Sequence, residues 1–230
     1  MHDVDVRQEI VDRVLARRGR YHMFDRLEPS RTAHLIIDMQ NTFVQEGAPA
    51  EVPVARDIVG NINGLNAALR ELGVRIIWVT HANMSDASGS DWRTFFDYIV
   101  ADEMRDRTMA ALLPEAEGQK IWHAMEVDEG DTQILKNRYS ALIPGSSQLE
   151  RILRAGGIEN VLISGTKTNV CCEATARDAM MMDFRVVMVS DCMAALSDDE
   201  HRATLETMIQ QFGDVMTRDE VLAVLRAKKN

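Results

Sequence analysis

Short runs of β-branched and aliphatic residues alternate along this chain with longer stretches in which apolar residues recur every three or four positions. Runs of the first kind predict buried strands, and stretches of the second kind predict amphipathic helices. Five runs are clear, and a weaker sixth follows them: residues 33–37, 74–79, 132–135, 160–164, 185–189 and 214–216. Because strands that alternate with helices favour βαβ units, we expect an α/β fold with a mostly parallel sheet.

The stretches between these runs carry helix signals. Residues 58–72 repeat an apolar side chain every three or four positions, and Gly73 follows as a helix stop. The same reasoning predicts further helices in the later part of the chain, at residues 149–153, 170–183, 198–212 and 218–228. Each would connect two strands or cover one face of the sheet.

Two regions depart from this alternation. Residues 3–17 predict an additional amphipathic helix, which could cover an edge of the fold or a partner subunit. Residues 80–125 show no strand period and contain five aromatic residues, which indicates an insertion over one end of the sheet. The chain shows no internal repeat and no low-complexity linker. We therefore expect an N-terminal helical extension at residues 1–30 and a single domain at 31–230 that contains the insertion.

Composition narrows the function classes. The chain has 230 residues with 46% hydrophobic side chains, which is enough for one core without disulfides or a structural metal. A formal net charge of −10 argues against nucleic acid and anionic membrane surfaces as partners. Three cysteines fit a reducing compartment. The polar N-terminus and the lack of a long apolar run predict neither a signal peptide nor a membrane span, so we expect a cytoplasmic protein.

Three reactive side chains follow predicted strands. Asp38 comes directly after the first run, Lys136 after the third, and Cys171 lies a few residues after the fourth, where a helix is expected to begin. In an open parallel sheet, ligands bind outside the carboxyl ends of the strands. The sequence therefore predicts a carboxylate, an ammonium and a thiol at one rim.

Thiol chemistry at neutral pH needs a way to form thiolate, and a free cysteine supplies little of it. A helix N-terminus and Lys136 would each favour thiolate at Cys171, whereas Asp38 could accept the thiol proton. The last two effects are opposite in sign, so the resting protonation state stays open. Taken singly, each residue could also have a purely structural role, as a turn aspartate, a solvated lysine and a small buried cysteine.

Three segments that hold these residues resemble the signature regions of the isochorismatase-like cysteine hydrolases: residues 35–41 (LIIDMQN), 135–141 (LKNRYSA) and 164–179 (SGTKTNVCCEATARDA). The likeness extends over about residues 31–216, and Thr-Asn-Val-Cys at 168–171 is its most specific part. The resemblance implies a three-layer, Rossmann-like fold, with a mostly parallel six-stranded sheet and helices on both faces. It also implies a homodimer or homotetramer.

In that family an Asp-Lys-Cys triad hydrolyses amides and ureido groups without a cofactor. The resemblance implies Cys171 as the nucleophile, Asp38 as the general base, and Lys136 as the group that positions Asp38 and stabilises developing charge. It further implies a cis peptide bond between Thr166 and Lys167. The backbone N–H groups of Lys167 and Cys171 would then form the oxyanion hole.

Two positions depart from the family pattern. Family members often have an aliphatic or small residue at the position of Lys167, whose side chain could face the pocket or solvent. Cys172 stands where valine is common, and at about 100° around the helix from Cys171 it should serve in packing. The six histidines show no metal-binding spacing, and residues 80–86 lack the Asp-x-His element of related nicotinamidases. We therefore expect that the protein holds no metal and that nicotinamide is not its substrate.

These features favour a metal-free amidohydrolase that forms a thioester intermediate on a small ureido, carbamoyl or carboxamide substrate. Among the branches of the family, the chain most resembles the ureidoacrylate amidohydrolases. One alternative is an isochorismatase-type vinyl ether hydrolase. Another is a non-catalytic α/β binding module, although no phosphate-binding glycine motif is present.

By position, four residues could line the pocket, and packing is their alternative role: Phe43, Asn83, Trp92 and Tyr139. Arg138 could bind a substrate carboxylate or pair with an acidic neighbour.

Overall fold

The computed structural model describes residues 1–86 and 89–227 of the chain. Within them, six strands form one sheet in the order β5-β2-β1-β6-β7-β8, and each neighbouring pair is parallel. The strands are β1 (Thr32–Ile37), β2 (Arg75–His81), β5 (Thr132–Lys136), β6 (Asn160–Thr166), β7 (Arg185–Ala194) and β8 (Asp214–Met216). The expected α/β fold is confirmed.

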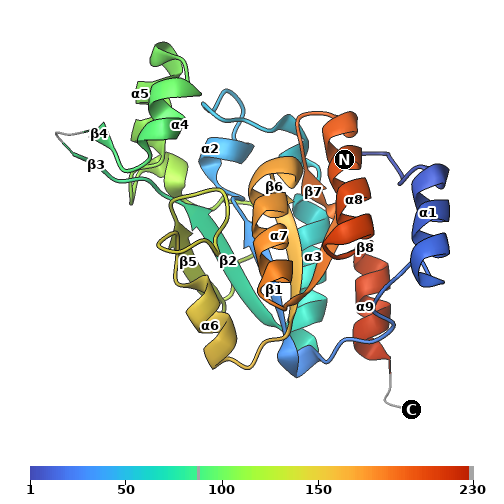
Figure 1. The fold of residues 1–230 in the computed structure, drawn as a ribbon. Coiled ribbons are helices and arrows are strands. Elements are labelled where there is room, and N and C mark those ends of the chain that lie inside the picture. The colour runs from blue at the N-terminus through green and yellow to red at the C-terminus, as the bar shows by residue number, and fades with distance from the viewer. Residues whose placement is uncertain (87–88, 228–230) are drawn as a thin grey trace.

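Helices cover both faces of this sheet because alternate strand residues point to opposite sides. Leu35 and Ile37 of β1 pack in one apolar cluster with the first set of helices, and Ile36 packs in the other cluster with the second set. The first set is α6 (Leu149–Ala155), α7 (Glu173–Met181) and α8 (Asp198–Gln211), and the second is α3 (Val59–Glu71) and α9 (Arg218–Arg226). Figure 1 shows α7 and α3 on opposite sides of the strands. Among the helices described, none has the length and apolar character needed to cross a bilayer.

The N-terminal helix begins later than its apolar pattern predicts. Helix α1 spans Gln8–Arg18, and Ile10 and Val14 bury its inner face beside α8. Arg7 is extended instead of helical, because its backbone N–H and its guanidinium both bond to the carboxylate of Glu206 in α8. Tertiary hydrogen bonds therefore override local helix propensity in the first residues. The domain boundary at residue 30 stays a prediction.

The expected insertion contains more regular structure than its sequence indicates. Strand β2 continues to His81, and a hairpin of two short strands follows, β3 (Ser85–Asp86) and β4 (Gly89–Ser90). Helices α4 (Arg93–Tyr98) and α5 (Asp102–Ala111) come next, and all four elements lie together at one end of the molecule (Figure 1). Strands of two residues are too short to show a period in the sequence. Other short helices in the described part of the chain are η1 (Pro29–Arg31), α2 (Asn41–Val44), η2 (Pro53–Arg56), η3 (Glu117–Gln119) and η4 (Thr168–Cys172).

Gly165 makes the close approach of β6 to β1 possible. Its φ is +105°, and a Cβ atom there would lie 2.0 Å from the carbonyl oxygen of Ile37. We expect Gly165→Ala to lower the free energy of unfolding by roughly 3 kcal/mol, because the two strands would have to separate. Gly60→Ala is the control, since Gly60 is an exposed helix residue with open space around it, and it should raise stability by roughly 0.5–1 kcal/mol. Urea unfolding of both variants measures the difference, and equal stabilities would contradict this account.

Candidate active site

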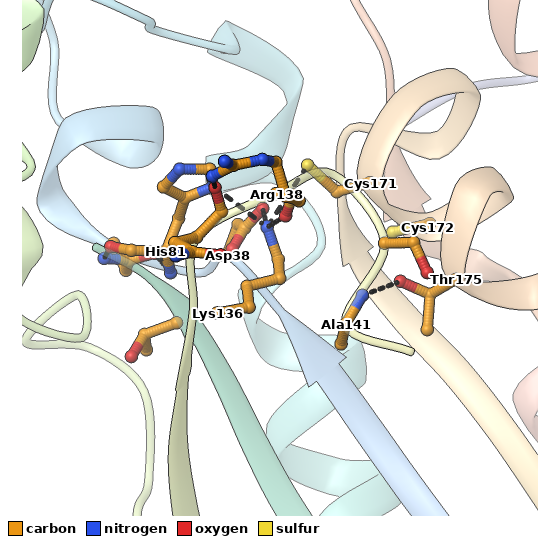
Figure 2. Close-up of polar contacts among 12 residues, drawn as sticks. Asp38, His81, Lys136, Arg138, Ala141, Cys171, Cys172 and Thr175 are labelled. Atoms are coloured by element: carbon orange, nitrogen blue, oxygen red, sulfur yellow. Dashed lines mark hydrogen bonds and ion pairs between the residues drawn. The ribbon is translucent and has the colours of Figure 1, made fainter. Parts of the chain in front are cut away.

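The carboxyl ends of three strands bring Asp38, Lys136 and Cys171 together. Asp38 follows β1, Lys136 is the last residue of β5, and Cys171 lies in a π-helical turn, η4 (Thr168–Cys172), after β6. Strands β1 and β6 are neighbours, and only β2 separates β1 from β5. Because all strands run in one direction, their carboxyl ends share one edge of the sheet, and the three side chains meet there (Figure 2).

The ammonium group of Lys136 lies at the centre of this cluster. Its Nζ is 2.9 Å from Oδ2 of Asp38 and 3.5 Å from Sγ of Cys171. It also donates to the carbonyl oxygen of Arg138 at 3.1 Å and lies 3.1 Å from Nδ1 of His81. Asp38 and Lys136 are fully buried, and Cys171 is 6% exposed. One cation therefore contacts both the carboxylate and the sulfur, out of reach of bulk water.

Burial and charge set the protonation of the three groups. Burial, and then the neighbouring Asp38, raises the pKa of Cys171 above that of a free thiol. Burial lowers the pKa of Lys136, but Asp38 and Cys171 outweigh this effect, so the pKa is raised overall and the ammonium persists. Burial raises the pKa of Asp38, and Lys136 offsets part of that rise. These directions favour a neutral thiol at Cys171 and an ammonium at Lys136, which pairs with Asp38 at 2.9 Å, so the sulfur needs a base when it attacks.

His81 is a member of this cluster that the sequence analysis did not identify. Its Nε2 lies 2.7 Å from Oδ1 of Asn83, which can only accept, so we assign the ring proton to Nε2. Nδ1 then faces the ammonium of Lys136 as an acceptor. Burial and the charge of Lys136 hold the pKa of His81 well below its ordinary value, so the ring is neutral. It lies two residues after the predicted run 74–79, and this place near the carboxyl end of a strand was the signal available.

The backbone angle of Asp38 and the side chain of the nearby Gln40 fix the segment that carries the carboxylate. Its φ of 53° lies in the left-handed region, which aspartate enters more readily than most residues. Two residues on, the side chain of Gln40 accepts from the N–H of His81 at 2.7 Å and donates to the carbonyl of His81 at 2.9 Å. This pair of bonds ties the end of β1 to the end of β2. The carboxylate is therefore carried by a locked segment and not by a free loop.

The turn with the nucleophile is also held from behind. The Oγ1 of Thr168 lies 2.9 Å from Nδ1 of the buried His201 in α8, and the N–H of Cys172 donates to the carbonyl of Lys167 at 3.2 Å. The Thr166–Lys167 peptide bond is cis. Cys172 is fully buried, with its Sγ 3.7 Å from the carbonyl of Ser164, and therefore serves in packing. Of the two thiols in this turn, Cys171 is the one that contacts Lys136.

A cavity of about 430 Å³ opens over Cys171. Phe43, Trp92 and Tyr139 line it, as does Lys167, whose side chain is half-buried. Its volume is within the usual range for small-molecule sites, roughly 300–1,000 Å³. Three of the four residues that we expected to line the pocket, Phe43, Trp92 and Tyr139, therefore do so.

Asn83 and Arg138 do not line this cavity, because their polar atoms bind other parts of the protein. The amide of Asn83 donates to Oδ1 of Asp91 at 2.9 Å, and its oxygen faces His81. The guanidinium of Arg138 donates to the carbonyl oxygens of Asn137 at 2.6 Å and Asp91 at 2.8 Å, and it lies 5.3 Å from the centre of the Trp92 ring. Arg138 therefore supports the wall from outside. Within residues 1–86 and 89–227, no group of three or more His, Cys, Asp or Glu side chains is arranged to hold a metal ion.

Comparisons with known proteins agree with this geometry. Residues 32–220 match the family model described as Isochorismatase domain. Ureidoacrylate amidohydrolase RutB of Rhizobium rhizogenes is 30% identical over 217 residues, which cover 86% of this chain and 85% of that protein. Enterobactin synthase component B of Escherichia coli is 30% identical over 195 residues, which cover 85% of this chain and 64% of that protein. The crystal structure of a cysteine hydrolase from Pseudomonas syringae pv. phaseolicola superposes with a TM-score of 0.77 at 27% identity, covering 86% of this chain and 94% of that one.

Proposed function

Because the chain belongs to the isochorismatase family of hydrolases, we propose that it is a cysteine amidohydrolase that cleaves a C–N bond of a small ureido, carbamoyl or carboxamide compound. The observation that carries this proposal is the contact of the Lys136 ammonium with both Asp38 and Cys171, whose thiol lines the cavity. A buried thiol beside an ion pair is suited to nucleophilic attack on a carbonyl that enters from above.

In the first half of the reaction, the sulfur of Cys171 attacks the substrate carbonyl while Asp38 accepts the thiol proton. The raised pKa of Cys171 makes this transfer necessary, because the thiol holds its proton until substrate arrives. The backbone N–H groups of Lys167 and Cys171 donate to the oxyanion of the tetrahedral intermediate. Asp38 then passes the proton to the departing nitrogen, and an acyl or carbamoyl thioester remains on Cys171.

In the second half, water attacks the thioester carbonyl, and Asp38 accepts a proton from that water. The C–S bond breaks, and the proton returns to the sulfur as the acid product leaves. Throughout, the ammonium of Lys136 balances the negative charge that moves between Asp38 and Cys171, which it contacts at 2.9 Å and 3.5 Å. Lys136 thus positions the base and limits the cost of charge in a buried site.

A second candidate is hydrolysis of a vinyl ether, the reaction after which the family is named. The match of residues 32–220 to the family model described as Isochorismatase domain supports it. The thiol of Cys171 in contact with Lys136 favours C–N cleavage, since protonation alone can break a vinyl ether without a nucleophilic sulfur. Ureidoacrylate-type compounds, which carry a carboxylate, are one branch of the proposed substrate class.

We expect the purified protein to release ammonia from at least one member of a panel of ureido acids, N-carbamoyl compounds and primary amides. A coupled assay for ammonia measures this, and a parallel assay for pyruvate on isochorismate measures ether cleavage. The Cys171→Ala variant is the control for ammonia from other sources. Pyruvate release without ammonia from any member of the panel would refute C–N cleavage and support the second candidate.

The proposal includes association into a homodimer or homotetramer. Two neighbouring residues of the region around α4 support it, because Tyr98 is 85% exposed and Ile99 is 67% exposed. Covering these side chains with a second subunit would remove apolar surface from water, which is favourable. Light scattering of the purified protein measures the mass in solution.

A further inference from the structure

The wall of the cavity that faces away from the triad is apolar. Helices α4 and α5, the segment between them, the loop that follows α5 and the short helix α2 supply most of it: Phe43, Phe95, Ile99, Val100, Met104 and Leu112. We propose that the substrate carries an uncharged alkyl or aryl group on the side remote from the scissile bond, and not a carboxylate. This inference rests on the proposed function and narrows its substrate class.

The aromatic residues between the triad and this wall form one connected surface. The ring of Trp92 stacks on that of Phe95 at 4.8 Å between centres and meets the ring of Tyr139 edge-on at 4.7 Å. The Trp92 ring also lies parallel to the neutral ring of His81 at 5.8 Å. This surface runs from His81, which touches Lys136, to Phe95 of α4. It offers a planar or aliphatic group continuous contact from the reacting carbonyl outwards.

The charges near the cavity do not suit a remote carboxylate. Lys167 is the one charged side chain among the described residues that line the cavity, and it belongs to the turn that carries Cys171, not to the apolar wall. The nearby Arg138 already donates to two backbone carbonyl oxygens and lines none of the cavity. A carboxylate against this wall would lose its hydration and meet one hydroxyl, that of Thr108, but no cation, which is unfavourable. Moving an alkyl or aryl group from water to the same place is favourable, because it removes apolar surface from water.

Alkylation of Cys171 tests the character of the wall without depending on turnover. The probes are N-alkyl iodoacetamides from methyl to hexyl and an iodoacetamide whose chain ends in a carboxylate; each forms a C–S bond and releases iodide. Mass spectrometry measures the rate at Cys171, and each rate is divided by the rate with free cysteine. We expect the relative rate to rise by up to about fourfold for each methylene that the wall covers. The carboxylate probe should react more slowly than the alkyl probe of equal length, and an equal or faster reaction would overturn the inference.

A matched pair of variants locates the effect in the wall. Met104 and Met109 both belong to α5, but only Met104 lines the cavity. Met104→Gln should lower the ratio of the hexyl rate to the methyl rate by about tenfold, because it places an amide against the alkyl chain. Met109→Gln should leave the ratio unchanged. A ratio that is the same in both variants would show that α5 does not select the chain.

The turnover panel separates failure of this inference from failure of the proposed function. Faster ammonia release from ureidoacrylate than from N-alkyl ureas and long-chain primary amides would overturn the apolar preference and leave the amidohydrolase intact. An alkylation preference for long chains, with no ammonia from any compound, would support the apolar wall and refute the amidohydrolase. Fastest release from the apolar compounds would support both.

Discussion

Cys171→Ala is expected to abolish hydrolysis of the C–N bond, with a fall in kcat/KM of about 10⁵-fold. The variant removes the atom that forms the thioester, and neither Asp38 nor Lys136 can replace it. It should fold normally, because alanine fills most of the space of a buried cysteine that makes one contact with Lys136. Steady-state kinetics on the best substrate of the ammonia panel measure the loss, and urea unfolding measures stability.

The other two thiols are matched controls for this experiment. Cys172 and Cys192 are fully buried in opposite core clusters of the described chain. Replacing either by alanine should lower stability by roughly 1–2 kcal/mol, through lost packing, and change kcat/KM by less than about threefold. Near-native hydrolysis by Cys171→Ala or Cys171→Ser would disprove the assignment of the nucleophile.

Asp38→Asn is expected to lower kcat/KM by roughly 10³-fold, since an amide cannot accept the proton of Cys171. In the native enzyme, kcat/KM should fall as pH falls through the pKa of Asp38, because only the carboxylate acts as a base. Burial raises that pKa above the ordinary value of 3.8, so the midpoint of the acid limb should lie above 3.8. The limb should be absent from the residual activity of Asp38→Asn. A pH profile with the same acid limb in both proteins would show that another group is the base.

The single variant will also be less stable, and a double variant separates the two effects. Asp38→Asn leaves the buried ammonium of Lys136 without its counter-ion, which costs roughly 3–5 kcal/mol. Combining Asp38→Asn with Lys136→Met removes both charges and should recover most of this stability. Activity should stay as low as in the single variant. Recovery of activity together with stability would mean that Asp38 acts only in folding.

Local sequence patterns determined the framework of this protein. The period of two in the strands and the period of three to four in the helices depend on neighbouring residues, so six strands and their crossover helices could be predicted from the chain alone. Parallel strands share one carboxyl edge, which made the meeting of Asp38, Lys136 and Cys171 an expectation before any coordinates. The sheet fixes the position of a residue that directly follows a strand.

Only the tertiary structure decided what depends on contacts between distant residues. Arg7 leaves the first helix because Glu206 binds it, and Arg138 is withdrawn from the cavity because the carbonyl oxygen of the distant Asp91 holds its guanidinium. The short strands and helices of the insertion, and the apolar wall they build over the cavity, have too little periodicity to be placed from sequence. Such choices of partner are made across long separations in the chain, where the free energy of one contact exceeds any local preference.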